Sequence, residues 1–279
     1  MGYTNIIQPY LDSFSGYASL AYYDFRTNQT FLHHATTTMR SASLIKLPIL
    51  SYALTQVAKG QLDLSQRITL KQTMQVAGAG ILHALQEGVT LSLQDLLTLM
   101  IIVSDNSATN ILIELLGQAN INQFIQDLGL QQTELIAKLQ LAKEKQNERQ
   151  LAGESNTTCA ADILGFLIRL EQRALLPDDL TDLMISILKK QQFTEALARY
   201  LPTDEELTKD VVQVAGKSGC LRGLWHDAAL IYDALGRPLY ALVVLTDGSK
   251  DLSYSWEQEG MLFIANVSKA MFEVFKAES

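Results

Sequence analysis

The sequence predicts an α/β protein of the α+β type, in which strands from both chain ends form one antiparallel sheet beside a large all-helical lobe. Strand-like runs occur near the two ends, at residues 16–35 and 211–248, whereas the stretch from about 60 to 205 alternates helical runs with polar turns. Because sequential strands usually pair, the two sets of strands can join in one sheet. Amphipathic runs at both termini then supply helices that cover a face of this sheet.

The first elements follow from apolar spacing. "GYASLAYYDF" and "QTFLHHA", joined by the polar "RTN", predict a strand hairpin. From Ser43 onward the apolar positions fit a helix that ends near Gly60, and Pro48 is tolerated there because first-turn N–H groups have no helical partner. An opening helix is predicted before the hairpin, where apolar residues recur at helical spacing: Ile6, Ile7, Tyr10, Leu11 and Phe14.

The remaining elements complete the two lobes. "LSLQDLLTLMIIV" and "ATNILIELLG" are the clearest helices of the middle region, and "VVQVAGKSG", "WHDAALIYDALG" and "RPLYALVVLTDG" predict three consecutive strands. We expect residues 1–40 and 211–279 to form a discontinuous sheet domain and residues 41–210 to form a helical domain. A closing helix is predicted through Phe263, Val267, Met271 and Phe275.

Composition limits the partners. The chain has 279 residues, 22 basic and 30 acidic, and a formal net charge of -8, which argues against nucleic acid or an anionic membrane as a partner. No apolar run reaches the length of a membrane span. The two cysteines, Cys159 and Cys220, cannot form a disulfide framework, and neither they nor the four histidines have metal-ligand spacing, so we expect no metal site. We also expect no cofactor and a monomer.

The opening "MGYTNIIQPYLDSF" lacks the basic region and continuous apolar region of a signal peptide. The sequence therefore predicts a cytoplasmic protein, or a mature chain whose leader is not included.

A serine stands three residues before a lysine in "RSASLIKLPIL", at Ser43 and Lys46. A lysine on an apolar helix face either extends to solvent or has a specific partner, which here would be the Ser43 hydroxyl. The spacing by itself is a weak signal, because Ser186 and Lys189 repeat it in "ISILKK". A helix cap beside a solvated lysine is the alternative for the first pair.

Two further motifs follow in the chain. "VSDNSATN" would by itself be a helix N-cap signal, and we expect its aspartate, Asp105, to tie down the turn. "VAGKSGCLRG" would by itself be a strand-ending turn. Together, in this order, the three motifs match the S-x-x-K, S-D-N and K-T-G set of class A β-lactamases and penicillin-binding proteins, with serine in place of threonine in the third. Ser186 follows the S-D-N motif and therefore cannot supply the first one.

The chain resembles the class A β-lactamases, and more closely the class A-like serine hydrolases related to them. "GAGIL", "NTTCAADIL" and "LRGLWHDAALIY" are similar to segments of that family, and the resemblance extends over nearly the whole chain. It implies the fold of serine β-lactamases and D-Ala-D-Ala peptidases, and a β-lactam or peptidoglycan-like substrate. It also implies action outside the cytoplasm if this is a mature fragment.

Breaking an amide requires a nucleophile, a route for its proton, an oxyanion site and a donor for the leaving nitrogen. Ser43 would be the nucleophile, and Lys46, one helical turn on, would take or steer its proton. The Ser43 N–H would be one oxyanion donor. The resemblance implies that the Cys220 N–H is the second, with no role for the Cys220 thiol.

The resemblance also implies roles for the other motif residues. Ser104 would pass a proton to the leaving nitrogen, and Lys217 would hold positive charge beside it. Asn106 would bind the amide side chain of the substrate and steady the active-site lysine, while Ser218 would bind the substrate carboxylate. Arg222 would be a second anion-binding group, or simply an exposed loop arginine.

The chain departs from the family where water must release the acyl group. The family has a glutamate there in an E-x-x-L-N pattern that this chain lacks, and "LIAKLQLAKEKQNERQLAGESNTT" has a composition that favours an exposed helix. Glu144 and Glu148 are candidate bases, with a solvated surface carboxylate as the alternative for each. Without a base, Ser43 would keep its acyl group for a long time.

Three functions remain open from the sequence. The leading one is a serine hydrolase of the class A β-lactamase type, opening a β-lactam or a related amide through an acyl-enzyme on Ser43. The second is a penicillin-binding D-Ala-D-Ala peptidase or transpeptidase, or an esterase, with slow deacylation. The third is a non-catalytic module that binds cell-wall peptides, against which the complete set of motif residues argues.

Overall fold

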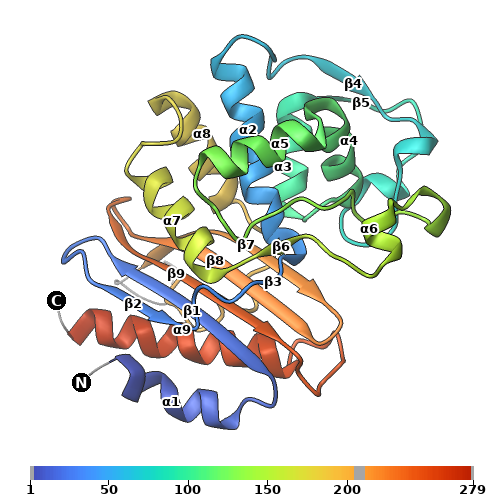
Figure 1. The fold of residues 1–279 in the computed structure, drawn as a ribbon. Coiled ribbons are helices and arrows are strands. Elements are labelled where there is room, and N and C mark those ends of the chain that lie inside the picture. The colour runs from blue at the N-terminus through green and yellow to red at the C-terminus, as the bar shows by residue number, and fades with distance from the viewer. Residues whose placement is uncertain (1–2, 204–210, 278–279) are drawn as a thin grey trace.

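A computed structural model describes residues 3–203 and 211–277, and it confirms the expected fold class. Strands from both chain ends form one five-stranded antiparallel sheet in the order β2-β1-β9-β8-β7. Helices α1 (Tyr3–Ser13) and α9 (Glu259–Ala277) cover one face of the sheet, and the helical part of the chain covers the other (Figure 1). The strands are β1 (Tyr17–Asp24), β2 (Thr30–His33), β7 (Val212–Leu221), β8 (Leu224–Asp233) and β9 (Pro238–Asp247).

The central strands have near-continuous apolar runs because helices cover both faces of the sheet. In β9, the residues from Tyr240 to Leu245 are fully buried. One apolar cluster joins the sheet to α1 and α9, and a second joins it to the helical part. The edge strand β7 packs against the turn that contains Ser43, so the open edge of the sheet borders the helical part.

Helix α2 (Lys46–Ala58) runs through the middle of the helical part, where Leu47, Leu50 and Leu54 are fully buried. Pro48 lies in its first turn, as predicted. The α-helix begins at Lys46 and not at Ser43, which lies in the preceding 3-10 turn η1 (Ala42–Ile45). Ser43 therefore precedes the first residue of α2, in a turn that packs against strand β7 of the sheet.

The other elements of the helical part are short. Its helices are α3 (Leu93–Ile102), α4 (Asn106–Leu116), α5 (Gln118–Asp127), α6 (Glu148–Leu151), α7 (Ala160–Glu171) and α8 (Asp178–Lys189). Its strands form two small two-stranded sheets. One pairs β3 (Met39–Arg40) with β6 (Thr157–Thr158), and the other pairs β4 (Arg67–Thr69) with β5 (Thr90–Ser92). Its other 3-10 turns are η2 (Gln72–Met74), η3 (Leu82–Ala84) and η4 (Lys143–Lys145).

The exposed helix that the composition of residues 135–158 favours does not form, so this prediction is wrong. Residues 135–142 are irregular, and only η4 and the single turn α6 are helical. Side-chain amides take the backbone N–H groups that a helix would use: Asn156 Oδ1 accepts from residues 136 and 137 at 2.7 and 2.9 Å, and Asn110 Oδ1 accepts from residue 139 at 2.8 Å. These long-range bonds override the helical preference of the composition.

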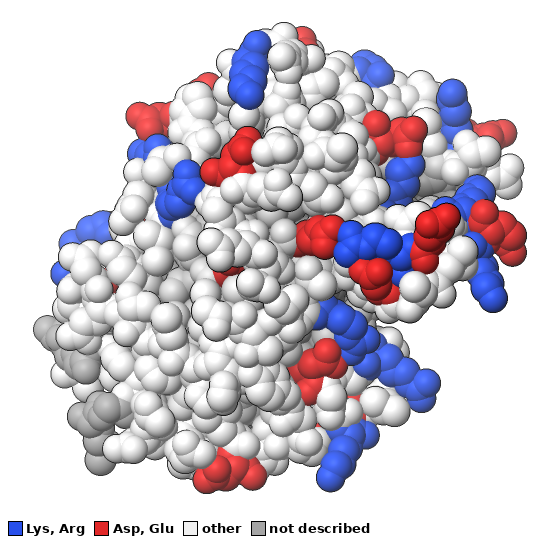
Figure 2. Space-filling model, in the orientation of Figure 1, with Lys and Arg blue, Asp and Glu red and all other residues white. Residues whose placement is uncertain are grey.

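Charged side chains of both signs are interleaved on the face drawn in Figure 2, most densely along the segment that carries α6. None of the helices within the described residues is long and apolar enough to cross a membrane. The expected domain boundary at residue 210 lies outside the described residues, and the division into two domains stays a prediction.

Candidate active site

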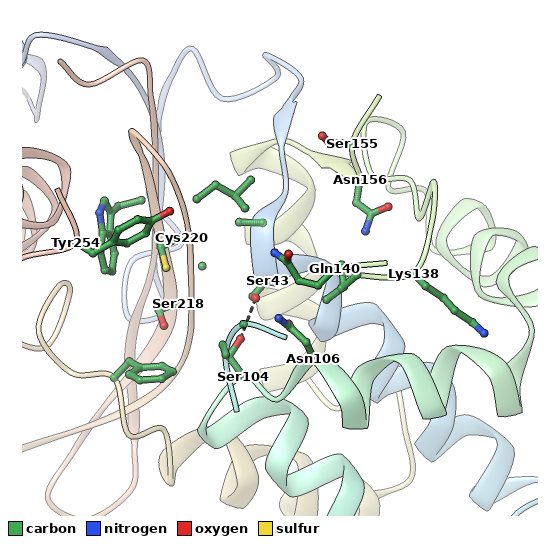
Figure 3. Close-up of a pocket in the computed structure, with 18 of the residues that line it drawn as sticks. Ser43, Ser104, Asn106, Lys138, Gln140, Ser155, Asn156, Ser218, Cys220 and Tyr254 are labelled. Carbon is green, nitrogen blue, oxygen red and sulfur yellow. Dashed lines mark hydrogen bonds between the residues drawn. The ribbon is translucent and has the colours of Figure 1, made fainter. Parts of the chain in front are cut away.

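A cleft of about 560 Å³ lies where the edge strand β7 meets the helical part. Its floor contains Ser43, and its walls come from β7, the connection between α3 and α4, residues 136–140 and residues 154–156. Figure 3 shows the labelled side chains of this cleft around Ser43. Segments that are far apart in the sequence therefore supply one concave site.

The turn η1 holds Ser43 at the floor of the cleft. Ser41 N donates to Asn156 O at 2.7 Å, which ties the turn to residues 154–156. Ala42 has a positive φ of 43°, an uncommon conformation for a residue with a side chain. The turn presents the half-buried Ser43 to the cleft, as a nucleophile requires.

Lys46 is fully buried behind Ser43 and does not extend to solvent. Its Nζ donates to Ser104 O at 2.6 Å, to Ser104 Oγ at 3.0 Å and to Asn106 Oδ1 at 3.0 Å. An ammonium group has three N–H donors, so these acceptors use all of them. Lys46 is therefore linked to Ser43 through Ser104 and not by a donor of its own.

Ser104 occupies the connection between α3 and α4 with a positive φ of 54°. The neighbouring Asp105 fixes this connection, because its carboxylate accepts from the backbone N–H groups of Ala108, Ile81 and Leu82 at 2.8, 2.6 and 2.8 Å. The expected capping role of Asp105 is confirmed. The left-handed conformation of Ser104, which the sequence does not reveal, points its hydroxyl at both lysines.

The Ser104 hydroxyl joins the three motifs. Its Oγ donates to Ser43 Oγ at 2.8 Å and accepts from Lys46 Nζ at 3.0 Å and from Lys217 Nζ at 3.1 Å. Lys217 is fully buried and also donates to Ser218 O at 2.6 Å. A hydroxyl has one donor and two acceptor sites, so all of the bonding capacity of Ser104 is in use.

Both lysines lose basicity in this site. Burial lowers the pKa of Lys46 well below its usual value, and the charge of Lys217 lowers it further. Burial lowers the pKa of Lys217 to about 8, against the opposing influence of the Asp227 carboxylate. The two shifts favour a neutral amine at Lys46 beside an ammonium at Lys217.

Gly219 brings β7 against the nucleophile turn. A Cβ built on Gly219 would lie 2.8 Å from Ser43 N, so only glycine permits this approach. Cys220 follows it in β7, an edge strand with backbone groups available to a ligand. The Cys220 side chain is exposed and borders the cleft, and partial burial raises the pKa of its thiol.

The cleft gathers most of the predicted site residues, but not all. Asn106, Ser218 and Cys220 line it together with Ser43 and Ser104, while the two lysines lie buried behind it. The structure does not bring three others into the cleft: Arg222 is exposed in the turn between β7 and β8, Glu144 in η4 and Glu148 at the start of α6.

Sequence reasoning missed several residues of the cleft, among them two carboxylates and one amide. Among the described residues, Glu154 and Glu195 are the carboxylates that line it, and Glu154 is paired with Arg149 at 2.7 Å. Gln140 also lines it, beside Gly78 and on the same side of Ser43 as Asn106 (Figure 3). No motif marks Gln140, because an irregular segment carries it.

No cluster of His, Cys, Asp or Glu within the described ranges could hold a metal ion.

The chain is similar to solved structures of beta-lactamases and of PBP-A. No curated protein matches the sequence. A beta-lactamase from Sphaerobacter thermophilus has 25% identity and a TM-score of 0.85, over 99% of this chain and 97% of that chain. A mutant of PBP-A, solved as an acyl-enzyme complex with penicillin-G, has 23% identity and a TM-score of 0.81, over 99% of this chain and 96% of that chain.

A beta-lactamase from Chitinophaga pinensis has 22% identity and a TM-score of 0.82, over 98% of each chain. These last two likenesses concern the fold. The family model described as "Beta-lactamase enzyme family" matches residues 3–275, which is nearly the whole chain. With its motifs converging on Ser43, the chain belongs to the beta-lactamase enzyme family.

Proposed function

We propose that Ser43 of this serine β-lactamase-type hydrolase is acylated by β-lactams and that water releases the acyl group slowly. One observation carries the proposal: the Ser43 hydroxyl is joined to two buried lysines through the single hydroxyl of Ser104. This arrangement can move a proton away from Ser43 and return it to a leaving nitrogen without any other group.

Acylation begins with Lys46 as a neutral amine. For the relay, the Ser104 hydroxyl turns to the lone pair of the neutral Lys46 and the Ser43 hydroxyl donates to Ser104 Oγ, which reverses the two bonds described above. Lys46 then takes the Ser104 proton while Ser104 takes the Ser43 proton, and Ser43 Oγ attacks the carbonyl carbon of the substrate. The backbone N–H groups of Ser43 and Cys220 stabilise the oxyanion. When the C–N bond breaks, the Lys46 ammonium returns its proton through Ser104 to the leaving nitrogen. The products of this step are the Ser43 ester and a neutral amine.

One charge and two polar side chains would hold the substrate. Lys217 keeps a positive charge beside Ser104, which favours proton delivery to the leaving nitrogen and attracts a carboxylate. Ser218 would donate to that carboxylate. Asn106, whose Oδ1 accepts from Lys46, would bind the amide side chain of the acyl half. A β-lactam or a peptidoglycan stem peptide has both groups, which supports either as substrate.

Two groups that line the cleft, Glu154 and Gln140, support slow release. Of the two carboxylates that line the cleft in the described part of the chain, Glu154 is held by Arg149. Gln140, on the Asn106 side of Ser43, is a neutral amide and cannot act as a general base. The PBP-A mutant was solved as an acyl-enzyme complex with penicillin-G, which supports the same kind of intermediate here.

Slow release also favours a second candidate function, a penicillin-binding D-Ala-D-Ala peptidase or transpeptidase. The time course of the Ser43 adduct separates the two. Intact-mass spectra after mixing with penicillin G should show one adduct that forms with the wild type and with Ser186→Ala, but not with Ser43→Ala. An adduct that persists for hours favours the second function, and one that disappears within seconds favours an efficient β-lactamase.

Absence of any adduct at Ser43 would refute the β-lactam assignment and favour a non-catalytic peptide-binding module.

We also propose that the protein acts as a monomer, because every group assigned above comes from one chain of 30.9 kDa. Light scattering during gel filtration would test this.

A further inference from the structure

The two sides of the cleft differ in chemistry. One side is rich in amides and other polar groups, and includes Asn106, Gln140 and Asn156. Figure 3 shows Gln140 and Asn156 on this side of Ser43, and Tyr254 on the opposite side, next to Cys220. Four aromatic residues that line the cleft form what we call the aromatic wall: Phe193, Trp225, Tyr254 and Trp256.

Three of the four residues of the aromatic wall are exposed to solvent. Tyr254 and Trp256 are each 65% exposed, and Phe193 is 40% exposed. Large aromatic side chains at these exposures leave apolar area in water, and a cluster of them beside a cleft marks a binding surface. Neither Tyr254 nor Trp256 belongs to a motif, and neither has a role in the proton transfers proposed for Ser43.

The loop that carries Tyr254 and Trp256 is held in place by hydrogen bonds. The Asp251 carboxylate accepts from Ser253 N and Glu259 N at 3.0 and 3.1 Å, and Gln258 Nε2 donates to Asp251 O at 2.8 Å. Arg199 donates to the backbone carbonyl of Trp256. A loop fixed in this way presents its aromatic side chains at little entropic cost on binding.

The wall lies beside strand β7 at Cys220 and near the connection that carries Ser104. Trp225 stands opposite Cys220 in the β7–β8 register. The segment before Phe193 packs beside the Ser104 connection, since Gln192 N donates to Ile102 O at 3.0 Å. In the proposed function, Asn106 on the polar side takes the acyl half of the substrate. The nitrogen-bearing half is then left for the side that contains the wall.

We infer that the aromatic wall binds a flat, apolar substituent on the nitrogen-bearing half of the substrate, and thereby sets substrate preference. This inference rests on the proposed function, because it uses the acylation of Ser43 as its readout. Aromatic stacking on the wall would contribute binding energy from a part of the substrate remote from the reacting carbonyl.

Nitrocefin and cephalothin test the inference, because they share the thienylacetamido acyl side chain and differ on the nitrogen-bearing half. Nitrocefin has a flat dinitrostyryl group there, and cephalothin has a small acetoxymethyl group. The measurement is the second-order rate of Ser43 acylation for each compound. We expect Trp256→Ala and Tyr254→Ala to lower the nitrocefin-to-cephalothin rate ratio by about 10-fold, the order of one aromatic pair.

Trp256→Phe, which keeps a ring, should restore most of the ratio. The matched control is Leu235→Ala, because Leu235 is 79% exposed in the turn between β8 and β9, outside the cleft, and it should leave both rates unchanged. A ratio that stays the same in both wall variants, while Ser43 is still acylated, would overturn the inference. Failure of the wild type to be acylated by either compound would instead refute the proposed function.

Discussion

Lys46 and Lys217 donate to the same atom: Ser104 Oγ lies 3.0 Å from one Nζ and 3.1 Å from the other. Two buried ammonium groups that share one acceptor repel each other, and each also loses hydration. The arrangement therefore favours a state in which Lys46 is a neutral amine and Lys217 keeps its proton. This division assigns the base to Lys46 and the fixed positive charge to Lys217.

The first prediction is a bell-shaped dependence of acylation on pH. The rate should rise as Lys46 loses its proton, since only the neutral amine can accept one. It should fall above a pH of about 8, where Lys217, with its pKa lowered by burial, becomes neutral. The measurement is the second-order acylation rate by penicillin G between pH 5 and 10 in buffers of constant ionic strength.

Lys217→Arg provides the control for the alkaline side of this profile. Arginine stays charged throughout the range, so the decline above a pH of about 8 should vanish even if the maximal rate is lower. An unchanged decline in Lys217→Arg would assign the alkaline limb to another group.

The second prediction concerns Ser104→Ala. Without this hydroxyl no described bond links Ser43 to either lysine, and acylation should slow by about 10²- to 10³-fold. The control is Ser107→Ala, which removes another buried hydroxyl of the same segment, one that is bonded to the backbone of Val76. Both variants should lose about 1 kcal/mol of stability, but only Ser104→Ala should lose acylation. Equal acylation rates in the two variants would exclude a relay.

The sequence predicts which elements carry the site residues better than it predicts the hydrogen bonds between those residues. The spacing of Ser43 and Lys46 predicts a shared face, and Lys46 does begin α2 just after the Ser43 turn. The acceptors of Lys46 lie on Ser104 and Asn106, 58 and 60 residues further along the chain. Which of these acceptors a lysine uses depends on the tertiary fold, which local patterns do not determine.

The sequence-based prediction of secondary structure fails in the segment around Gln140. Its composition favours a helix, but its N–H groups are taken by asparagine side chains from distant elements, including Asn110 and Asn156. The aromatic wall has the same origin, since its members come from three separate segments. A residue whose role depends on such contacts leaves no periodic or motif signal.

The third prediction tests the close approach of β7 to the nucleophile. In Gly219→Ala the added Cβ would lie 2.8 Å from Ser43 N, so β7 or the Ser43 turn must shift and the oxyanion site must open. We expect acylation to fall by about 10²- to 10³-fold, as for loss of one oxyanion donor. Gly165→Ala in α7 is the matched control, because a Cβ there meets nothing within 4 Å.

Gly165→Ala should keep the wild-type acylation rate and gain about 1 kcal/mol of stability from its better helix propensity. Thermal unfolding and stopped-flow acylation of the two variants measure both effects. Normal acylation in Gly219→Ala would show that the oxyanion site does not depend on this contact.

The fourth prediction concerns Gln140→Glu, which introduces a general base for hydrolysis of the acyl-enzyme. Gln140 lines the cleft on the Asn106 side of Ser43, where its neutral amide cannot take a proton from water. Gln140→Glu introduces a carboxylate of nearly the same shape in that place. A general base contributes about 10²- to 10⁴-fold, so the lifetime of the penicillin adduct should shorten by at least about 10²-fold while its formation changes less.

Gln150→Glu is the control, because Gln150 lines the same cleft but its side chain donates to Lys138 O at 3.1 Å. The same gain of negative charge at this position should leave the adduct lifetime close to that of the wild type. If the two variants shorten the lifetime equally, the effect is electrostatic and does not depend on position. If neither does, water cannot reach the ester from the Gln140 side, and slow release has a cause other than the missing carboxylate.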